Sequence, residues 1–403
     1  MNEDAGFIPP GPTAAEAASD RTGDGPPRGS RWDPDVAASV VSILGFSLAL
    51  GFAGLVLPLL ALAAGYDFAA VGILTAISAI AQLGVRLALP RIITRVPDRV
   101  LIVAANVMMV VSFGLLFIST DVPAFVIAQL LQGAARALFW TASQTHAVRG
   151  TGGVVRSLAI VQTVGNVGQL VGPAVAGVVA GQSLDAALLL AAAAAFVGLL
   201  AGLAMAYLPP FARPVRTGGP RLWQRPGVDL ACWASYSAGG WRAMLSSFVP
   251  VGLAAAGQPP AVIGFLLMLT ESAGLAASSV LLRHRPTNVR RWLEMAVLIV
   301  SGSLVAFPVA AGSAVLAGLA LALGGIGSGL LMSPGPALAT ESVQPEERGE
   351  AITVAGTFRA AALLVTPAAV SAALLVVALP IGLLVAALAI GAPPIAAAIR
   401  RPS

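Results

Sequence analysis

The sequence predicts an all-α polytopic membrane protein, with twelve transmembrane helices in two six-helix halves around a central cavity. Hydrophobic residues make up 57% of the 403-residue chain and charged residues only 10%, against roughly 25% charged residues in soluble domains. From Val36 onward, apolar runs of about 20 residues recur, each long enough to cross a bilayer as a helix. The arginines also gather in every second connector between these runs.

The chain before the first apolar run has a different composition. Residues 1–35 are rich in proline, glycine and acidic residues, which predicts a disordered N-terminal tail. The tail lacks the basic start and short apolar core of a signal peptide.

The apolar runs after the tail divide into twelve expected helices. Their ranges are 36–63, 68–89, 100–119, 123–142, 157–180, 185–208, 228–254, 261–282, 292–311, 313–339, 350–373 and 377–398. Residues 209–227 form the longest basic connector, a cytoplasmic linker between an N-terminal bundle (36–208) and a C-terminal bundle (228–403). Two sequential six-helix bundles are the pattern of a membrane protein built from parallel repeats.

The arginines predict the orientation of these helices. All 23 basic residues are arginine, and the connectors after odd-numbered helices contain none. The connectors after even-numbered helices and the C-terminal end carry Arg91, Arg95, Arg99, Arg149, Arg156, Arg213, Arg216, Arg221, Arg225, Arg283, Arg285, Arg290, Arg291, Arg348, Arg400 and Arg401. By the positive-inside rule, we expect a multi-pass protein of the cell inner (cytoplasmic) membrane with both termini in the cytoplasm.

Several function classes are disfavoured by the composition. The arginines are scattered between apolar runs and form no soluble basic face, so nucleic acid is not an expected partner. Cys232 is the only cysteine, and His146 and His284 have no metal-ligand spacing. With no catalytic constellation and no phosphate-binding glycine loop, we expect no enzyme, no cofactor and no metal site, and a monomer in the lipid bilayer.

Helix 5 contains a row of glycines in the segment GNVGQLVGPAVAG. Glycines three and four residues apart make a smooth helix face that another helix can approach closely, and the following proline bends the helix. The segment resembles the helix-5 antiporter motif of the major facilitator superfamily, G-x-x-x-G-P-x-x-G-G, at Gly168, Gly172, Pro173 and Gly177. Ordinary small-residue packing is the alternative, since the chain has 44 glycines.

The connector between helices 2 and 3, LPRIITRVPDRVLI, resembles a degraded form of the signature loop of the same superfamily, G-x-x-x-D-R-x-G-R-R. Arg95 and Arg99 match its basic positions as parts of a conformational motif. Thr94 replaces the aspartate that helps to lock one conformation in the family, although Asp98 lies nearby.

Helix 4 contains QLLQGAARALFW, which resembles the superfamily motif R-x-x-Q-G of the proton-coupled branches. Gln132 and Gly133 match this motif, Gln129 takes the place of its arginine, and Arg136 follows one turn later. The three resemblances together imply a drug or metabolite exporter whose cavity is lined by helices 1, 2, 4, 5, 7, 8, 10 and 11.

Four ionisable residues lie near mid-span: Arg136, Arg242, Glu271 and Arg359. A charged residue facing lipid at mid-helix costs about 2.5–3.5 kcal/mol, so these side chains should face a watery cavity or one another. All four are on helices that the resemblance places around the cavity.

Glu271 is the only carboxylate near mid-span and is the candidate for proton coupling. Burial favours the protonated form of a carboxyl group, and a nearby arginine favours the ionised form, so a site between these influences can load and release a proton. The alternative is a permanent salt bridge from Glu271 to Arg242 that holds helix 8 to helix 7.

The three mid-span arginines are candidates for the substrate cavity, because guanidinium groups suit carboxylates and phosphates. Their excess over one glutamate favours an anionic or zwitterionic small-molecule substrate. Alternatively, Arg136 and Arg359 bond backbone carbonyls or glutamines such as Gln162 and Gln169. Trp140 and Trp241 could stack on the substrate, or pack between helices.

The leading hypothesis is therefore a secondary active transporter that exports a small organic solute in exchange for protons by alternating access. The antiporter motif favours export. The runner-up is a proton-coupled importer of an organic anion, which the arginine excess would also suit. A non-transporting receptor or a lipid flippase on the same fold is the alternative from another class.

Overall fold

The structure, a computed structural model, describes residues 33–149, 154–210, 223, 225, 227–283, 288–332, 343 and 348–399. The helices in the described part are α2 (Pro34–Ala63), α3 (Phe68–Ile92), α4 (Asp98–Ile118), α5 (Val122–Ala147), α6 (Val154–Ala180), α7 (Leu184–Ala204), α8 (Val228–Leu245), α9 (Phe248–Ala255), α10 (Pro260–Arg283), α11 (Val289–Ala310), α12 (Ala314–Met332), α14 (Arg348–Leu374) and α15 (Leu379–Ile399). The expected tail (1–35) and linker (209–227) lie largely outside the described residues.

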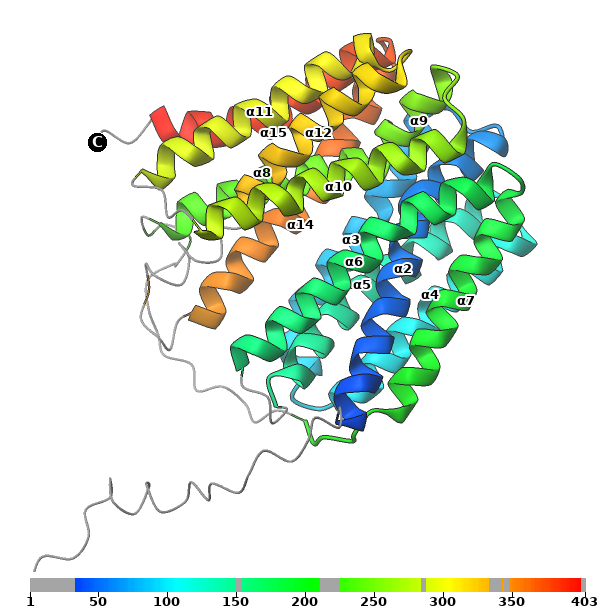
Figure 1. Ribbon diagram of the computed structural model, residues 1–403, viewed down its shortest axis with the longest axis vertical. Coiled ribbons are helices and arrows are strands. Elements are labelled where there is room, and N and C mark those ends of the chain that lie inside the picture. The colour runs from blue at the N-terminus through cyan, green and yellow to red at the C-terminus, as the bar shows by residue number, and fades with distance from the viewer. Residues whose placement is uncertain are drawn as a thin grey trace, which may run out of the picture.

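The helices agree with the predicted fold class. Ten of the described helices are long and apolar enough to cross a membrane. The two remaining expected spans correspond to the consecutive pair α8 and α9, and to α15, whose apolar part covers Leu379–Ala392. Figure 1 shows these helices as two sets, α2–α7 in blue to green and α8–α15 in green to red.

Span 7 differs from its prediction as one helix over 228–254. It is broken, because α8 ends at Leu245 and α9 begins at Phe248. Pro250 supplies a physical reason: it has no N–H to donate to the carbonyl of Ser246 four residues earlier, and its ring crowds that carbonyl.

Two serines at this break donate hydrogen bonds to carbonyls of the last turn of α8. Ser246 Oγ donates to the Arg242 carbonyl at 3.1 Å, and Ser247 Oγ donates to the Ala243 carbonyl at 2.6 Å. Side-chain bonds of this kind compete with the helical ladder. The break therefore lies one turn beyond Arg242, close to the middle of the bundle.

The two ends of the bundle differ in charge and are named accordingly. The arginine-rich end, at which α2 begins, carries Arg91, Arg95, Arg99 and Arg149, and the arginine-poor end carries Asp67, Asp121 and Asp185. The ribbons of the two halves converge at the arginine-poor end and separate toward the arginine-rich end (Figure 1).

Two of the acidic residues at the arginine-poor end cap helices. Asp67 accepts a hydrogen bond from the backbone N–H of Ala70 at 2.7 Å, and Asp121 accepts one from Ala124 at 2.9 Å. An N-cap carboxylate satisfies an open N–H and complements the positive end of the helix dipole. These acids are therefore explained by helix capping as well as by topology.

The glycine row of α6 makes two different contacts. A Cβ atom added at Gly172 would lie 2.8 Å from Gly51 Cα on α2, within the same half. A Cβ added at Gly177 would lie 2.4 Å from the Pro260 carbonyl oxygen and 3.1 Å from Gly264 Cα, both on α10 of the other half. The row therefore packs the N-terminal half together and also joins it to the C-terminal half at the arginine-poor end.

Candidate functional site in the central cavity

Arg242 connects three helices near the middle of the bundle. It lies on α8 and donates hydrogen bonds to Glu271 on α10 and to Gln169 on α6. The side chains of Arg242 and Glu271 are each 27% exposed, so the ion pair is partly solvated. Because Gln169 belongs to the other half, this contact bridges the two halves.

Arg136 on α5 and Arg359 on α14 are also close to the middle of their helices, and both are half-buried. Both lie within electrostatic reach of Arg242. In the part of the chain that the structure describes, neither forms an ion pair or a side-chain hydrogen bond, and the buried Arg136 Nε has no partner.

The glutamine contacts considered for these two arginines are not formed. Gln162 Nε2 donates to Asn166 Oδ1 at 3.0 Å, and Gln169 accepts from Arg242. The guanidinium groups of Arg136 and Arg359 thus keep donors available for another group.

Arg86 is a fourth central arginine that the sequence analysis missed. It lies on α3, and its Nη1 donates to the Gly356 carbonyl of α14 at 3.4 Å. Its Nε is buried without a partner among the described residues. Arg86 also lies within electrostatic reach of Arg359. In the ranges that the structure describes, each half therefore contributes two arginines to the central region.

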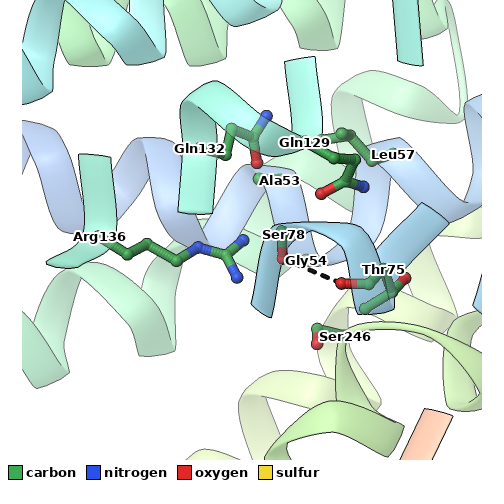
Figure 2. Close-up of a pocket in the computed structure, with 9 residues that line it drawn as sticks. All are labelled: Ala53, Gly54, Leu57, Thr75, Ser78, Gln129, Gln132, Arg136 and Ser246. Atoms are coloured by element: carbon green, nitrogen blue, oxygen red, sulfur yellow. Dashed lines mark hydrogen bonds between the residues drawn. The ribbon is translucent and has the colours of Figure 1, made fainter. Parts of the chain in front are cut away.

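A small polar pocket lies next to Arg136 and has room for about one water molecule. Its polar lining residues are Thr75, Ser78, Gln129, Gln132, Arg136 and Ser246. Figure 2 shows the Arg136 side chain extending from its helix toward Ser78. Through Ser246, the break in span 7 contributes to a pocket that is otherwise built from α2, α3 and α5.

The two candidate tryptophans have different environments. Trp241 is only 1% exposed, and its ring packs against Gly324, where an added Cβ would lie 2.1 Å from it. The prediction that Trp241 lines the cavity is therefore wrong, because its side chain fills the core of the C-terminal half. Trp140 is partly buried, packs on Gly165 of α6 and meets Phe139 edge to face at 6.0 Å.

The basic loop before α4 is tied to its own half. Arg95 is exposed, and Arg99 donates to a backbone carbonyl at the end of α7. Asp98 is 1% exposed, accepts a hydrogen bond from Thr145 Oγ1 at 2.9 Å and lies 3.7 Å from Arg149 Nε. The Asp98 carboxylate therefore lies beside this loop and links α4 to α5.

Comparison with known proteins agrees with this architecture. The family model described as Major Facilitator Superfamily matches residues 38–367. A search of curated protein sequences finds no match.

Two crystal structures of the nucleoside transporter NupG, one of them a mutant, resemble the chain with a TM-score of 0.68. The mutant is 13% identical and the match covers 91% of this chain; for the other structure these values are 14% and 92%, and each match covers 98% of NupG. At such identity the likeness shows the fold alone. With a family model that matches most of its length, the chain belongs to the Major Facilitator Superfamily of membrane transporters.

Proposed function

We propose that this protein is a secondary active transporter that moves a small organic solute by alternating access and couples this movement to protons at Glu271. The observation that carries the proposal is the contact of Arg242 with both Glu271 and Gln169. Protonation of Glu271 would remove its charge and release one donor of Arg242. Because Arg242 also holds Gln169, this change would alter a contact between the halves.

The direction of transport has two candidates. Export in exchange for protons is supported by the resemblance of the α6 glycines to the antiporter motif of the superfamily. Uptake of an organic anion together with protons is the other candidate; the excess of arginine over glutamate around the cavity suits an anionic solute in either direction. A lipid flippase or a receptor on this fold would require neither proton coupling nor transport of a water-soluble solute.

The test of the proposed function is solute-driven proton movement in proteoliposomes. The full chain is reconstituted with a trapped pH-sensitive dye and screened with anionic, zwitterionic and cationic solutes by counterflow. We expect that a pH gradient drives the accumulation of at least one solute, and that adding this solute moves protons. If a solute is transported whatever the pH gradient, and its transport moves no protons, the proposed proton coupling is wrong.

The proposed orientation places both termini in the cytoplasm, and cysteine labelling in whole cells checks it. Gln182 is exposed at the arginine-poor end and Tyr207 is exposed just beyond α7 at the arginine-rich end. Cys232 is fully buried, and its replacement by serine gives a cysteine-free protein in which only the introduced cysteine can be labelled. With an impermeant maleimide, Gln182→Cys should be labelled from outside and Tyr207→Cys should be protected until the membrane is opened. The reverse pattern would invert the topology.

A further inference from the structure

We propose that the central cavity binds its solute as an organic oxyanion held by arginines of both halves, and that this anion binds more tightly when Glu271 is protonated. The inference rests on the proposed proton role of Glu271. It adds the chemical class of the solute and the sign of the coupling between solute and proton.

Positive charge is in excess among the side chains that meet in the cavity. The N-terminal half contributes Arg86 and Arg136, and the C-terminal half contributes Arg242 and Arg359, whose charges interact with one another. Among the described residues, Glu271 is the only carboxylate that contacts this group. Like charges repel strongly where the surroundings are poorly polarisable, so a bound anion would relieve the repulsion.

Two of these arginines have hydrogen-bond donors available for a solute. Arg242 is engaged by Glu271 and Gln169, whereas Arg136 and Arg359 have no ion pair within the described residues. A guanidinium group presents parallel N–H donors that match the oxygens of a carboxylate, sulfonate or phosphate. Arg136 extends beside the polar pocket (Figure 2), so its guanidinium group borders a polar surface.

The charges around Glu271 give the sign of the coupling between solute and proton. The charged groups near Glu271 are Arg242 from α8 and Arg359 from α14. Of the other helices packed against α10, α9 and α12 contain no titratable residue, and α6 contains only Arg156 near its start. Within the described part of the chain, every charge near Glu271 is therefore positive.

Protonation of Glu271 would remove the single counter-charge and free a donor of Arg242. Both effects strengthen the attraction for an anion. By linkage, a bound anion then favours protonation of Glu271 to the same degree. Proton and anion should bind together and cross in the same direction, which favours the uptake candidate over exchange.

The test uses three probes of similar size that differ in charge: benzenesulfonate, neutral benzenesulfonamide and cationic benzamidine. Their binding to the purified full-length protein is measured by calorimetry and thermal unfolding. Benzenesulfonate keeps its charge at every working pH, so any pH dependence belongs to the protein. We expect benzenesulfonate to bind best and its affinity to rise on the order of tenfold on acidification, the range of a typical coupling between sites.

Matched variants locate the effect. Glu271→Gln should bind benzenesulfonate tightly at every pH, because the negative charge that competes for Arg242 is then permanently absent. Arg136→Gln and Arg359→Gln should each weaken binding on the order of tenfold or more, since each loses a charge-assisted bond. Arg91→Gln removes the same charge from an exposed position in the last turn of α3 and should leave binding unchanged.

Clear outcomes would overturn the inference. These are equal binding of the three probes, no binding of benzenesulfonate, or a pH dependence that persists in Glu271→Gln. The wild-type pH series requires no variant and so tests the coupling even if a variant misfolds. If the binding results hold but proteoliposomes show no proton-coupled transport, the proposed function fails while the anion site stands.

The oxyanion could come from a solute or from a lipid headgroup, and bilayer composition separates the two. Binding is repeated in bilayers of phosphatidylcholine alone and with phosphatidylglycerol added. An unchanged benzenesulfonate affinity supports a water-soluble anion as the cargo. A strong loss of affinity with phosphatidylglycerol would overturn that assignment in favour of a lipid headgroup in the same site.

Discussion

Glu271→Gln should abolish uphill transport driven by a pH gradient and leave downhill exchange of the same solute intact. Glutamine keeps the shape of the side chain and can still accept a hydrogen bond from Arg242, but it cannot titrate. The neutral amide resembles the protonated carboxyl, so the variant should still move solute. Both modes are measured in proteoliposomes, with and without an imposed gradient.

The fold of this variant should survive, because Arg242 keeps other partners. It still bonds Gln169, and at 27% exposure its guanidinium retains contact with solvent. If the pair were instead a permanent structural bridge, an orphaned buried arginine would cost about 3–5 kcal/mol. Folding and both transport modes would then fail together, and adding Arg242→Gln would restore them.

A matched control is available on α11. Glu294 pairs with Arg290 at 3.0 Å, with side chains 43% and 42% exposed. Glu294→Gln makes the same chemical change in a solvated pair, which contributes little to stability, and should leave both transport modes unchanged. Full uphill transport in Glu271→Gln would contradict the proton role and require another proton site.

The membrane spans were predictable because they depend on one-dimensional properties of the chain. Hydrophobic length identifies each helix, and the alternation of arginine between connectors separates one hairpin from the next. A contact between Arg242 and Glu271 could be proposed from the sequence as one of two alternatives. Both residues lie near the middle of consecutive spans, and a charged side chain there needs a partner.

The break in span 7 was missed because a proline does not by itself decide whether a membrane helix continues. Pro58, Pro173 and Pro367 all lie inside unbroken helices. At Pro250, the serines four and three residues earlier bond carbonyls of the preceding turn. It is this local combination, rather than the proline alone, that ends α8.

Arg86 was missed because the end of its helix was placed too early. Span 2 was expected to end at residue 89, but α3 continues to Ile92, which moves Arg86 deeper into the bundle. A signal was present, since Ser78, Gln82 and Arg86 are four residues apart and so share one helix face. The partner of Gln169 could not be predicted, because it depends on how the two halves meet.

Gly177→Ala should slow transport by opening the contact between the halves at the arginine-poor end. The added Cβ would lie 2.4 Å from the Pro260 carbonyl oxygen and 3.1 Å from Gly264 Cα. Both are backbone atoms that no side-chain rotation can move, so α6 and α10 must separate. Overpacking of this kind typically costs about 1–3 kcal/mol, which corresponds to a shift of about 5- to 150-fold between two conformations.

Two other glycines separate this effect from general damage to packing. Gly172→Ala would place its Cβ 2.8 Å from Gly51 Cα within one half, and Gly114 has no atom within 4 Å of an added Cβ. Gly172→Ala should therefore lower the thermal stability of the protein. Gly114→Ala should leave transport unchanged. Its thermal stability should be equal to or slightly above that of the wild type, since alanine favours the helix.

The opening itself can be measured at Leu57, which lines the pocket and is 3% exposed. In a Cys232→Ser background, Leu57→Cys should react faster with an impermeant maleimide from the arginine-poor side when Gly177→Ala is added. Unchanged labelling together with unchanged transport would mean that Gly177 reflects only the glycine-rich composition. A loss of thermal stability without faster labelling would place Gly177 with Gly172 as a packing residue, because a residue that controls opening must change the accessibility of the pocket.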